Sequence, residues 1–147
     1  MKLASLFSGG KDSTYSIYKA KQIGHDIECL VTIFPKSSES QLLHFSTIEL
    51  TKLQAKTMKV PQIVSELNSD KMEDEMNVLK TLLEKAKKDF QIEGIVHGGI
   101  SSEFQKRCFE NICKENDLKI VIPLWKTSPK EYMNDLINSG FKFILTS

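Results

Sequence analysis

The stretch of residues 8–13, with the sequence SGGKDS, restricts the possible folds of this chain more than any other. It follows the mostly apolar run 3–7 and precedes a helical pattern that begins at Thr14, so it predicts a loop between a strand and a helix. Such a loop directs backbone N–H groups and the positive end of a helix dipole toward one point, where a phosphate can bind. Gly9 and Gly10 lack a Cβ, so they can take positive φ and let an anion approach the main chain.

The side chains after the two glycines also suit a polyphosphate. Lys11 supplies a mobile positive charge, the Asp12 carboxylate can help to hold Mg²⁺, and the Ser13 hydroxyl can donate to a phosphate oxygen. The stretch matches neither the G-x-x-x-x-G-K-[ST] loop nor the G-x-G-x-x-G fingerprint. A polar turn without a ligand is the plainer alternative, but six ordered residues at a strand end favour a phosphate site.

Strands and helices alternate along the rest of the 147 residues. Apolar and β-branched segments predict strands at 3–7, 27–34, 62–66, 94–97, 119–124 and 141–146. Helical patterns cover 14–22, 48–58 and 72–90, and two further helices are expected to follow Ser102 and Ser128. This alternation predicts a single α/β domain, with an open, mostly parallel sheet of five or six strands covered by helices on both faces.

The longest helical segment carries an apolar stripe that is expected to pack on the sheet. The residues of the stripe are Met72, Met76, Leu79, Leu83, Ala86 and Phe90.

A second glycine turn follows the fourth predicted strand. His97 ends that strand, Gly98 and Gly99 come next, and Ser102 with Gln105 forms a capping box at a helix start. A glycine turn between a strand end and a helix can face the first one across the crevice of the sheet. His97 could therefore touch a phosphate or an adenine, although a histidine hydrogen-bonded within the core is the other interpretation.

Composition limits the classes of function. Twenty basic and nineteen acidic side chains give a net charge of +1, which provides no global field to attract nucleic acid. No apolar run approaches the ~20 residues of a membrane span, so we expect a cytoplasmic protein. Cys29, Cys108 and Cys113 form no C-x-x-C pair and are expected to be small buried side chains. Without a nucleophile elbow or a cluster of metal ligands, catalysis would depend on positioning and on neutralising charge at a departing phosphate.

Two signatures resemble known families. Residues 8–13 look like the S-G-G-x-D-S loop of the PP-loop ATP pyrophosphatases, and a second pattern resembles that of the diphthine–ammonia ligases. The second pattern consists of Glu93, Gly94, Ile95, Val96, His97, Gly98, Gly99, Ile100, Ser102, Glu103, Phe104, Gln105, Glu110, Cys113, Pro123, Leu124 and Trp125. The resemblance extends over essentially the whole chain.

The resemblance implies an adenine nucleotide alpha hydrolase-like, Rossmann-like fold and the last step of diphthamide synthesis. ATP, with Mg²⁺, would activate the carboxylate of diphthine on translation elongation factor two as an acyl adenylate. Ammonia would then displace AMP to give the amide. The implied partners are the diphthine-bearing elongation factor and ammonium. The composition argues against a membrane or nucleic acid as partner, and a homodimer is left open.

The resemblance also implies roles for individual residues. Catalytic roles fall to Lys11 and Asp12, and Asp12 would also hold the metal. The nucleotide would contact Ser8, Gly9, Gly10, Lys11, Asp12, Ser13, Phe34, His97, Gly98 and Gly99. The acceptor would contact His44, Ser102, Phe104, Gln105 and Glu110.

The sequence departs from the family pattern at two positions. His44 is followed by Phe45-Ser46-Thr47 in place of the usual T-P-N, and Cys108 stands where an arginine is expected. Relatives continue beyond position 147 into a glycine- and glutamate-rich segment, so we expect residues 1–147 to be the ATP-binding half. Two other functions stay open at this point, namely a PP-loop ligase acting on another acceptor such as a tRNA base, and a non-catalytic adenine-nucleotide-binding module.

Overall fold

A computed structural model describes residues 1–35, 48–69, 71–99 and 102–140, and these contain one parallel sheet with the strand order β3-β2-β1-β4-β5. The strands are β1 (Lys2–Leu6), β2 (Asp26–Pro35), β3 (Gln62–Leu67), β4 (Gly94–Val96) and β5 (Lys119–Val121). The helices are α1 (Lys11–Ile23), α2 (Ile48–Met58), α3 (Met72–Phe90), α4 (Glu103–Glu115) and α5 (Pro129–Asn138).

The strand order changes direction at β1. The chain proceeds from β1 outward to β2 and β3, and then returns to place β4 on the other side of β1. Open parallel sheets bind ligands at such a switch point, in the crevice outside the carboxyl ends of the strands. The topology therefore points to the carboxyl ends of β1 and β4, and it confirms the predicted α/β fold.

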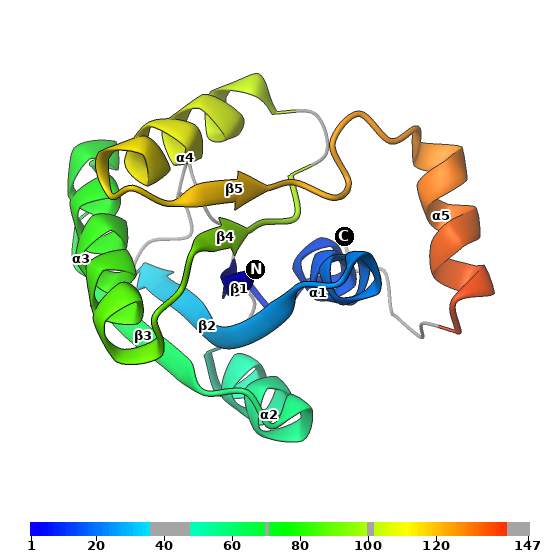
Figure 1. Cartoon of the computed structure of the whole chain (residues 1–147), viewed down its shortest axis with the longest axis horizontal. Coiled ribbons are helices and arrows are strands. Elements are labelled where there is room, and N and C mark those ends of the chain that lie inside the picture. Colours follow the sequence, from blue (N-terminus) through cyan, green and yellow to red (C-terminus); the bar gives the residue numbers. More distant parts are fainter. Residues whose placement is uncertain (36–47, 70, 100–101, 141–147) are drawn as a thin grey trace.

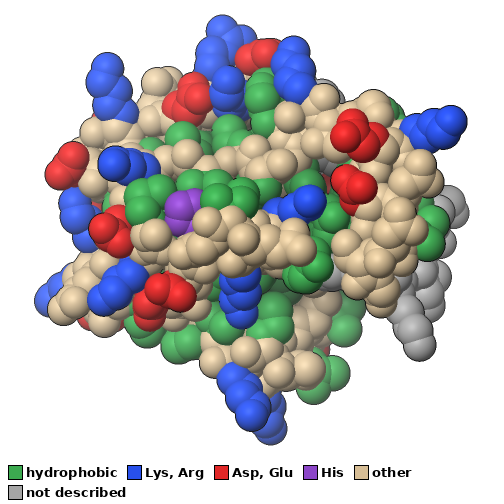
Figure 2. Space-filling model, turned by 45° about the vertical axis from the view of Figure 1, so that its right-hand side comes forward, with side chains coloured by type: hydrophobic (Ala, Val, Ile, Leu, Met, Phe, Trp, Pro, Cys, Tyr) green, Lys and Arg blue, Asp and Glu red, His purple; other side chains and the backbone are tan. Residues whose placement is uncertain are grey.

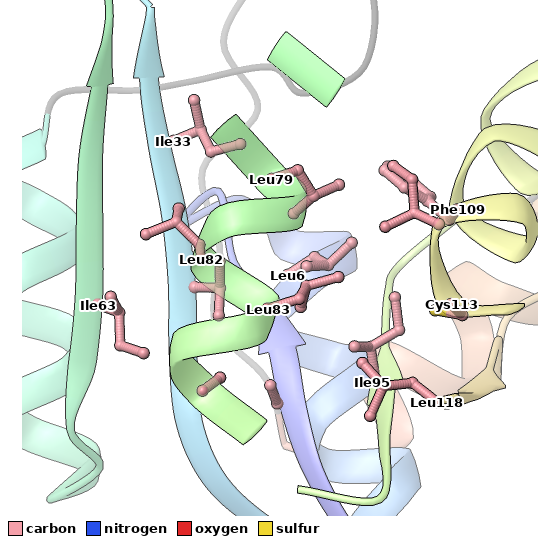
Figure 3. Close-up of a cluster of buried hydrophobic side chains, with 14 of the residues drawn as sticks. Leu6, Ile33, Ile63, Leu79, Leu82, Leu83, Ile95, Phe109, Cys113 and Leu118 are labelled. Carbon is pink, nitrogen blue, oxygen red and sulfur yellow. The ribbon is translucent and has the colours of Figure 1, made fainter. Parts of the chain in front are cut away.

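Helices cover both faces of the sheet, with α3 and α4 on one face and α1 and α2 on the other (Figure 1). Successive side chains of β1 therefore point to opposite faces of the sheet. Ala4 and Leu6 belong to the larger core, while Leu3 and Phe7, the residue after β1, pack with residues of α1 and α2. Figure 3 shows the larger core, in which Leu79 and Leu83 of α3 lie between the strands and α4. The stripe predicted for α3 is confirmed.

Several predicted element boundaries are wrong by a few residues. Helix α1 begins at Lys11 and not at Thr14, because the Thr14 N–H already donates to the Gly10 carbonyl at 3.1 Å. Strand β4 stops at Val96, which places His97 in the following turn, and β5 stops at Val121. The strand predicted at 141–146 lies outside the described residues.

Capping residues mark the starts of α4 and α5, as predicted at Ser102 and Ser128, and the end of α1. The Ser102 hydroxyl accepts from the Gln105 N–H at 3.3 Å, and the Ser128 hydroxyl accepts from the Glu131 N–H at 3.2 Å. Gly24 ends α1 in the left-handed region, with φ of 107°.

The three cysteines are buried and free, as expected. Burial raises the pKa of the Cys29 and Cys113 thiols to about 12, so both stay protonated and unreactive at neutral pH.

Candidate functional site

Hydrogen bonds with β2 hold the carboxyl end of β1 in place. The Phe7 N–H donates to Val31 O at 2.9 Å, and the buried Thr32 hydroxyl donates to Phe7 O at 2.9 Å. The Gln62 amide in turn donates to the Thr32 hydroxyl at 2.9 Å and to the Thr51 hydroxyl at 3.2 Å. The loop therefore starts from a strand end whose position is determined by both β2 and α2.

The two glycines of the loop differ in conformation. Gly9 has φ of 84°, in the region that favours glycine, as the sequence analysis anticipated. Gly10 has φ of −78° and ψ of 173°, so it is extended and serves as the N-cap of α1. The positive φ considered for Gly10 is thus not needed. In this arrangement the first N–H groups of α1, from Lys11 onward, have no partner within the helix.

Serine side chains brace the loop from within. The Ser13 hydroxyl lies 3.2 Å from both the Ser8 hydroxyl and the Gly10 carbonyl, and the Ser8 N–H points to it at 3.4 Å. Ser13 is buried, so its hydroxyl supports the loop from the inside in this state. Its predicted donation to a phosphate stays a prediction.

Helix α2 holds the loop from the side. The Gln54 amide donates to the Gly9 carbonyl at 3.1 Å, a contact that the sequence analysis missed. An apolar hollow of about 240 Å³ lies beside this contact, between α1 and α2. It is lined by Phe7, Thr14, Leu53, Gln54, Thr57 and Met58.

Lys11 and Asp12 meet at the first turn of α1. The Lys11 ammonium lies 2.8 Å from Asp12 Oδ1, and their side chains are 34% and 38% exposed, so both can reach a ligand. The hydroxyl of Tyr132, from α5, donates to the same oxygen at 2.5 Å. Burial, followed by the hydrogen bond to Asp12, raises the pKa of Tyr132 far above its usual range. Sequence reasoning also missed Tyr132, which had no motif to mark it.

The second glycine turn lies directly against the first. A Cβ added at Gly98 would lie 2.7 Å from the carbonyl carbon and oxygen of Asp12 and 2.9 Å from the Ser13 nitrogen. The turns after β1 and β4 therefore meet at the N-terminus of α1, as the sequence analysis expected for two glycine turns facing one crevice.

His97 lies in the core beneath that turn. The residue is 4% exposed, and its ring packs edge-on against Phe109 with 4.8 Å between ring centroids. Its Nδ1 accepts from the Gly99 N–H at 3.0 Å, so the proton of the neutral ring is on Nε2, which has no partner among the described residues. Burial lowers the pKa of His97 to about 4. This geometry agrees with the interpretation of a core histidine, while contact with a nucleotide stays a prediction.

The remaining predicted residues are more dispersed. Phe34 lies near the carboxyl end of β2, Ser102 caps α4, and Phe104 and Gln105 occupy the first turn of that helix. Glu110 is farther along α4 and pairs with Lys106 at 3.7 Å. His44 lies outside the described residues.

One face of the molecule carries charged side chains of both signs (Figure 2). Basic and acidic side chains are interspersed on the face shown in Figure 2. Among the described residues, no three His, Cys, Asp or Glu side chains gather into a metal-binding group. No described helix is long and apolar enough to cross a membrane.

Comparison with known proteins gives a consistent result. The family model of the diphthamide synthase N-terminal domain matches residues 1–120. The diphthine–ammonia ligases of Mus musculus and Homo sapiens are each 28% identical over 166 residues, covering 99% of this chain and 61% of their own length. The Saccharomyces cerevisiae diphthine–ammonia ligase is 30% identical over 156 residues, covering 92% of this chain and 22% of its own length. The chain thus spans less than two thirds of the relatives it matches.

A solved structure shares the fold. It is a predicted subunit of tRNA methyltransferase from Methanocaldococcus jannaschii, with a TM-score of 0.61 and 20% identity, covering 97% of this chain and 76% of that chain. At this level of identity the likeness concerns architecture alone. The family model, by contrast, matches most of the sequence, and the chain therefore belongs to the diphthamide synthase N-terminal domain family.

Proposed function

We propose that this domain binds ATP with Mg²⁺ at the N-terminus of α1, and that the full-length protein uses it to convert diphthine on translation elongation factor two into diphthamide. The carboxylate of diphthine would attack the α-phosphorus of ATP, and the bond from that phosphorus to the pyrophosphate oxygen would break. Ammonia would then attack the acyl carbon of the adenylate. AMP would leave with the bonding electron pair, and the nitrogen would lose a proton to give the amide.

The observation that carries the proposal is the meeting of two glycine turns at one helix start. No side chain at position 98 would fit against Asp12, and Gly9, in the loop after β1, has a left-handed conformation that favours glycine. Backbone N–H groups of the first helical turn and the Lys11 ammonium supply positive charge at this place. Such an arrangement binds phosphate and can stabilise a departing pyrophosphate.

The residues present also fit a magnesium ion. Mg²⁺ in nucleotide sites is usually held by one or two carboxylates together with phosphates and waters, and not by an all-protein cage. Asp12 is a partly exposed carboxylate within the first turn of the phosphate-binding helix, so it can serve as that single protein ligand. When bound, the metal would neutralise charge on the phosphates.

The exchange of pyrophosphate into ATP tests the adenylation step. We expect Lys11→Ala and Asp12→Ala each to abolish exchange in the full-length protein while leaving its thermal unfolding cooperative. Lys21→Ala is the matched control, because Lys21 is exposed in the last turn of the same helix. Exchange retained by both site variants would show that the nucleotide binds elsewhere.

The identity of the acceptor needs a second experiment. The full-length protein is incubated with ATP, ammonium and diphthine-bearing elongation factor, and the mass change of the factor is followed together with the nucleotide products. Amide formation with AMP and pyrophosphate supports the proposal. Bound but intact ATP would favour a nucleotide-binding module, and tight, salt-sensitive tRNA binding would favour a ligase acting on RNA.

A further inference from the structure

Tyr132 connects helix α5 to the first turn of α1. Its hydroxyl donates to Asp12 Oδ1, although the two residues are 120 positions apart. The tyrosine is 3% exposed, whereas the Asp12 side chain is 38% exposed. A buried, fixed donor thus holds a carboxylate that solvent and ligands can reach.

We propose that Tyr132 is a positioning residue for Asp12. Its hydroxyl anchors one carboxylate oxygen, so that the other stays available to a metal ion, and it keeps this hold when Lys11 moves from Asp12 to the phosphates. The inference rests on the function proposed above, since it assigns a role within the same nucleotide site.

The aromatic surroundings of Tyr132 fix the position of its hydroxyl. Its ring stacks on Tyr15 of α1, with centroids 5.6 Å apart and an interplanar angle of 13°, and Tyr15 stacks on Tyr18 at 5.7 Å. Leu124 and Leu136 complete this buried cluster. Because the ring packs against Tyr15 and against these two leucines, packing determines the position of its hydroxyl oxygen.

Lys11 could not provide the same anchor. Its ammonium shares Asp12 Oδ1 with Tyr132 and lies 5.4 Å from the centre of the Tyr132 ring, but its side chain is 34% exposed and long enough to turn toward a phosphate. Once Lys11 turns away, Tyr132 is the partner that remains. Burial and Asp12 both raise the pKa of the phenol, so it stays a donor at every physiological pH.

Tyr132→Phe removes the hydroxyl and keeps the ring in the stack. Binding of a non-hydrolysable ATP analogue to the full-length protein is measured by calorimetry over a range of Mg²⁺ concentrations. We expect the half-saturating Mg²⁺ concentration to rise about tenfold, the effect of losing one hydrogen bond to a charged group. Affinity for the analogue without Mg²⁺ should stay close to that of the wild type, which a merely structural role would not predict.

Tyr18→Phe is the matched control. It removes a hydroxyl from the same tyrosine stack, but that hydroxyl accepts from the Gln22 amide on the exposed side of α1, six positions along the helix from Asp12. We expect this variant to keep the wild-type dependence on Mg²⁺. An equal rise in both variants would show that general loosening of the stack is responsible, and would overturn the inference.

A double-mutant cycle isolates the pair. In an Asp12→Asn background, Tyr132→Phe should cause no further rise in half-saturating Mg²⁺, because the carboxylate that it positions is already gone. A wild-type protein that binds no analogue would refute the proposed function. If the wild type binds the analogue normally, two results would refute only the role of Tyr132. One is an unchanged Mg²⁺ dependence in Tyr132→Phe, and the other is an equal effect of Tyr132→Phe in the wild-type and Asp12→Asn backgrounds.

Discussion

Gly98 touches Asp12 so closely that no other residue fits between the two glycine turns. A Cβ at position 98 would lie 2.7 Å from the Asp12 carbonyl oxygen, a separation that real Cβ atoms do not adopt, and the group that it would meet is backbone. The turn after β4 and the first turn of helix α1 are therefore in contact through main chain at the point where we propose that the phosphates bind. The position of one turn determines the position of the other.

Gly98→Ala should accordingly destabilise the fold and weaken binding of ATP. Forcing a methyl group against backbone costs about 1–3 kcal/mol, because α1 and the turn after β4 must separate. Gly10→Ala is the control for stability, since its Cβ would meet the Ser8 hydroxyl at an ordinary 3.6 Å and Gly10 already has negative φ. Thermal unfolding of the two variants measures the difference. Equal melting temperatures would contradict the close contact.

How much of the fold and of the candidate site can be predicted from the sequence depends on whether a feature arises from neighbouring residues or from residues far apart in the chain. The glycine loop, the stripe on α3 and the cap at Ser102 are local patterns, and with the alternation of strands and helices they led to the correct fold class and to two glycine turns that lie against each other. That a nucleotide binds at these turns stays a prediction. The hydrogen bond from Tyr132 to Asp12 and that from Gln54 to Gly9 join different helices, and no local pattern encodes them.

The start of α1 illustrates a second limit. Lys11 and Asp12 carry no apolar periodicity, so the predicted helical pattern did not extend to them. The extended backbone of Gly10 and its bond from Thr14 place them in its first turn.

Burial of His97 predicts a loss of stability in mild acid. A folded-state pKa of about 4, below the ordinary value of 6.5, means that the unfolded chain takes up a proton first. The free energy of unfolding should thus be unaffected by this group above pH 6.5 and should fall by about 3 kcal/mol as pH drops toward 4. Denaturant unfolding of the wild type and of His97→Gln at several pH values measures this share. Parallel pH profiles for the two proteins would show that His97 is protonated without penalty.

Replacement of Gln54 should weaken ATP binding more than it lowers the stability of the fold. Gln54→Met keeps the volume beside the apolar hollow but removes the donor to the Gly9 carbonyl, so the loop after β1 loses its lateral hydrogen bond. We expect weaker ATP binding, by about fivefold to tenfold, for the loss of one ordinary hydrogen bond that orders the loop. Lys56→Gln, at an exposed position in the last turn of α2 that does not line the hollow, is the control. Calorimetry should find ATP affinity changed in the first variant and unchanged in the second; the reverse order would refute the bracing role of Gln54.

Removal of the buried Thr32 hydroxyl should lower the free energy of unfolding by more than its size suggests, because the hydroxyl makes two hydrogen bonds at once. It donates to Phe7 O and accepts from the Gln62 amide, so Thr32→Val leaves a buried acceptor and a donor without their partner at nearly constant volume. The expected cost is about 1–3 kcal/mol in the free energy of unfolding. Thr32→Ser keeps the hydroxyl and loses only a methyl group, so it should cost less than Thr32→Val when both are measured by denaturant unfolding. A serine variant less stable than the valine variant would contradict this. Packing of the methyl group, and not the two hydrogen bonds of the hydroxyl, would then hold the carboxyl end of β1 in place.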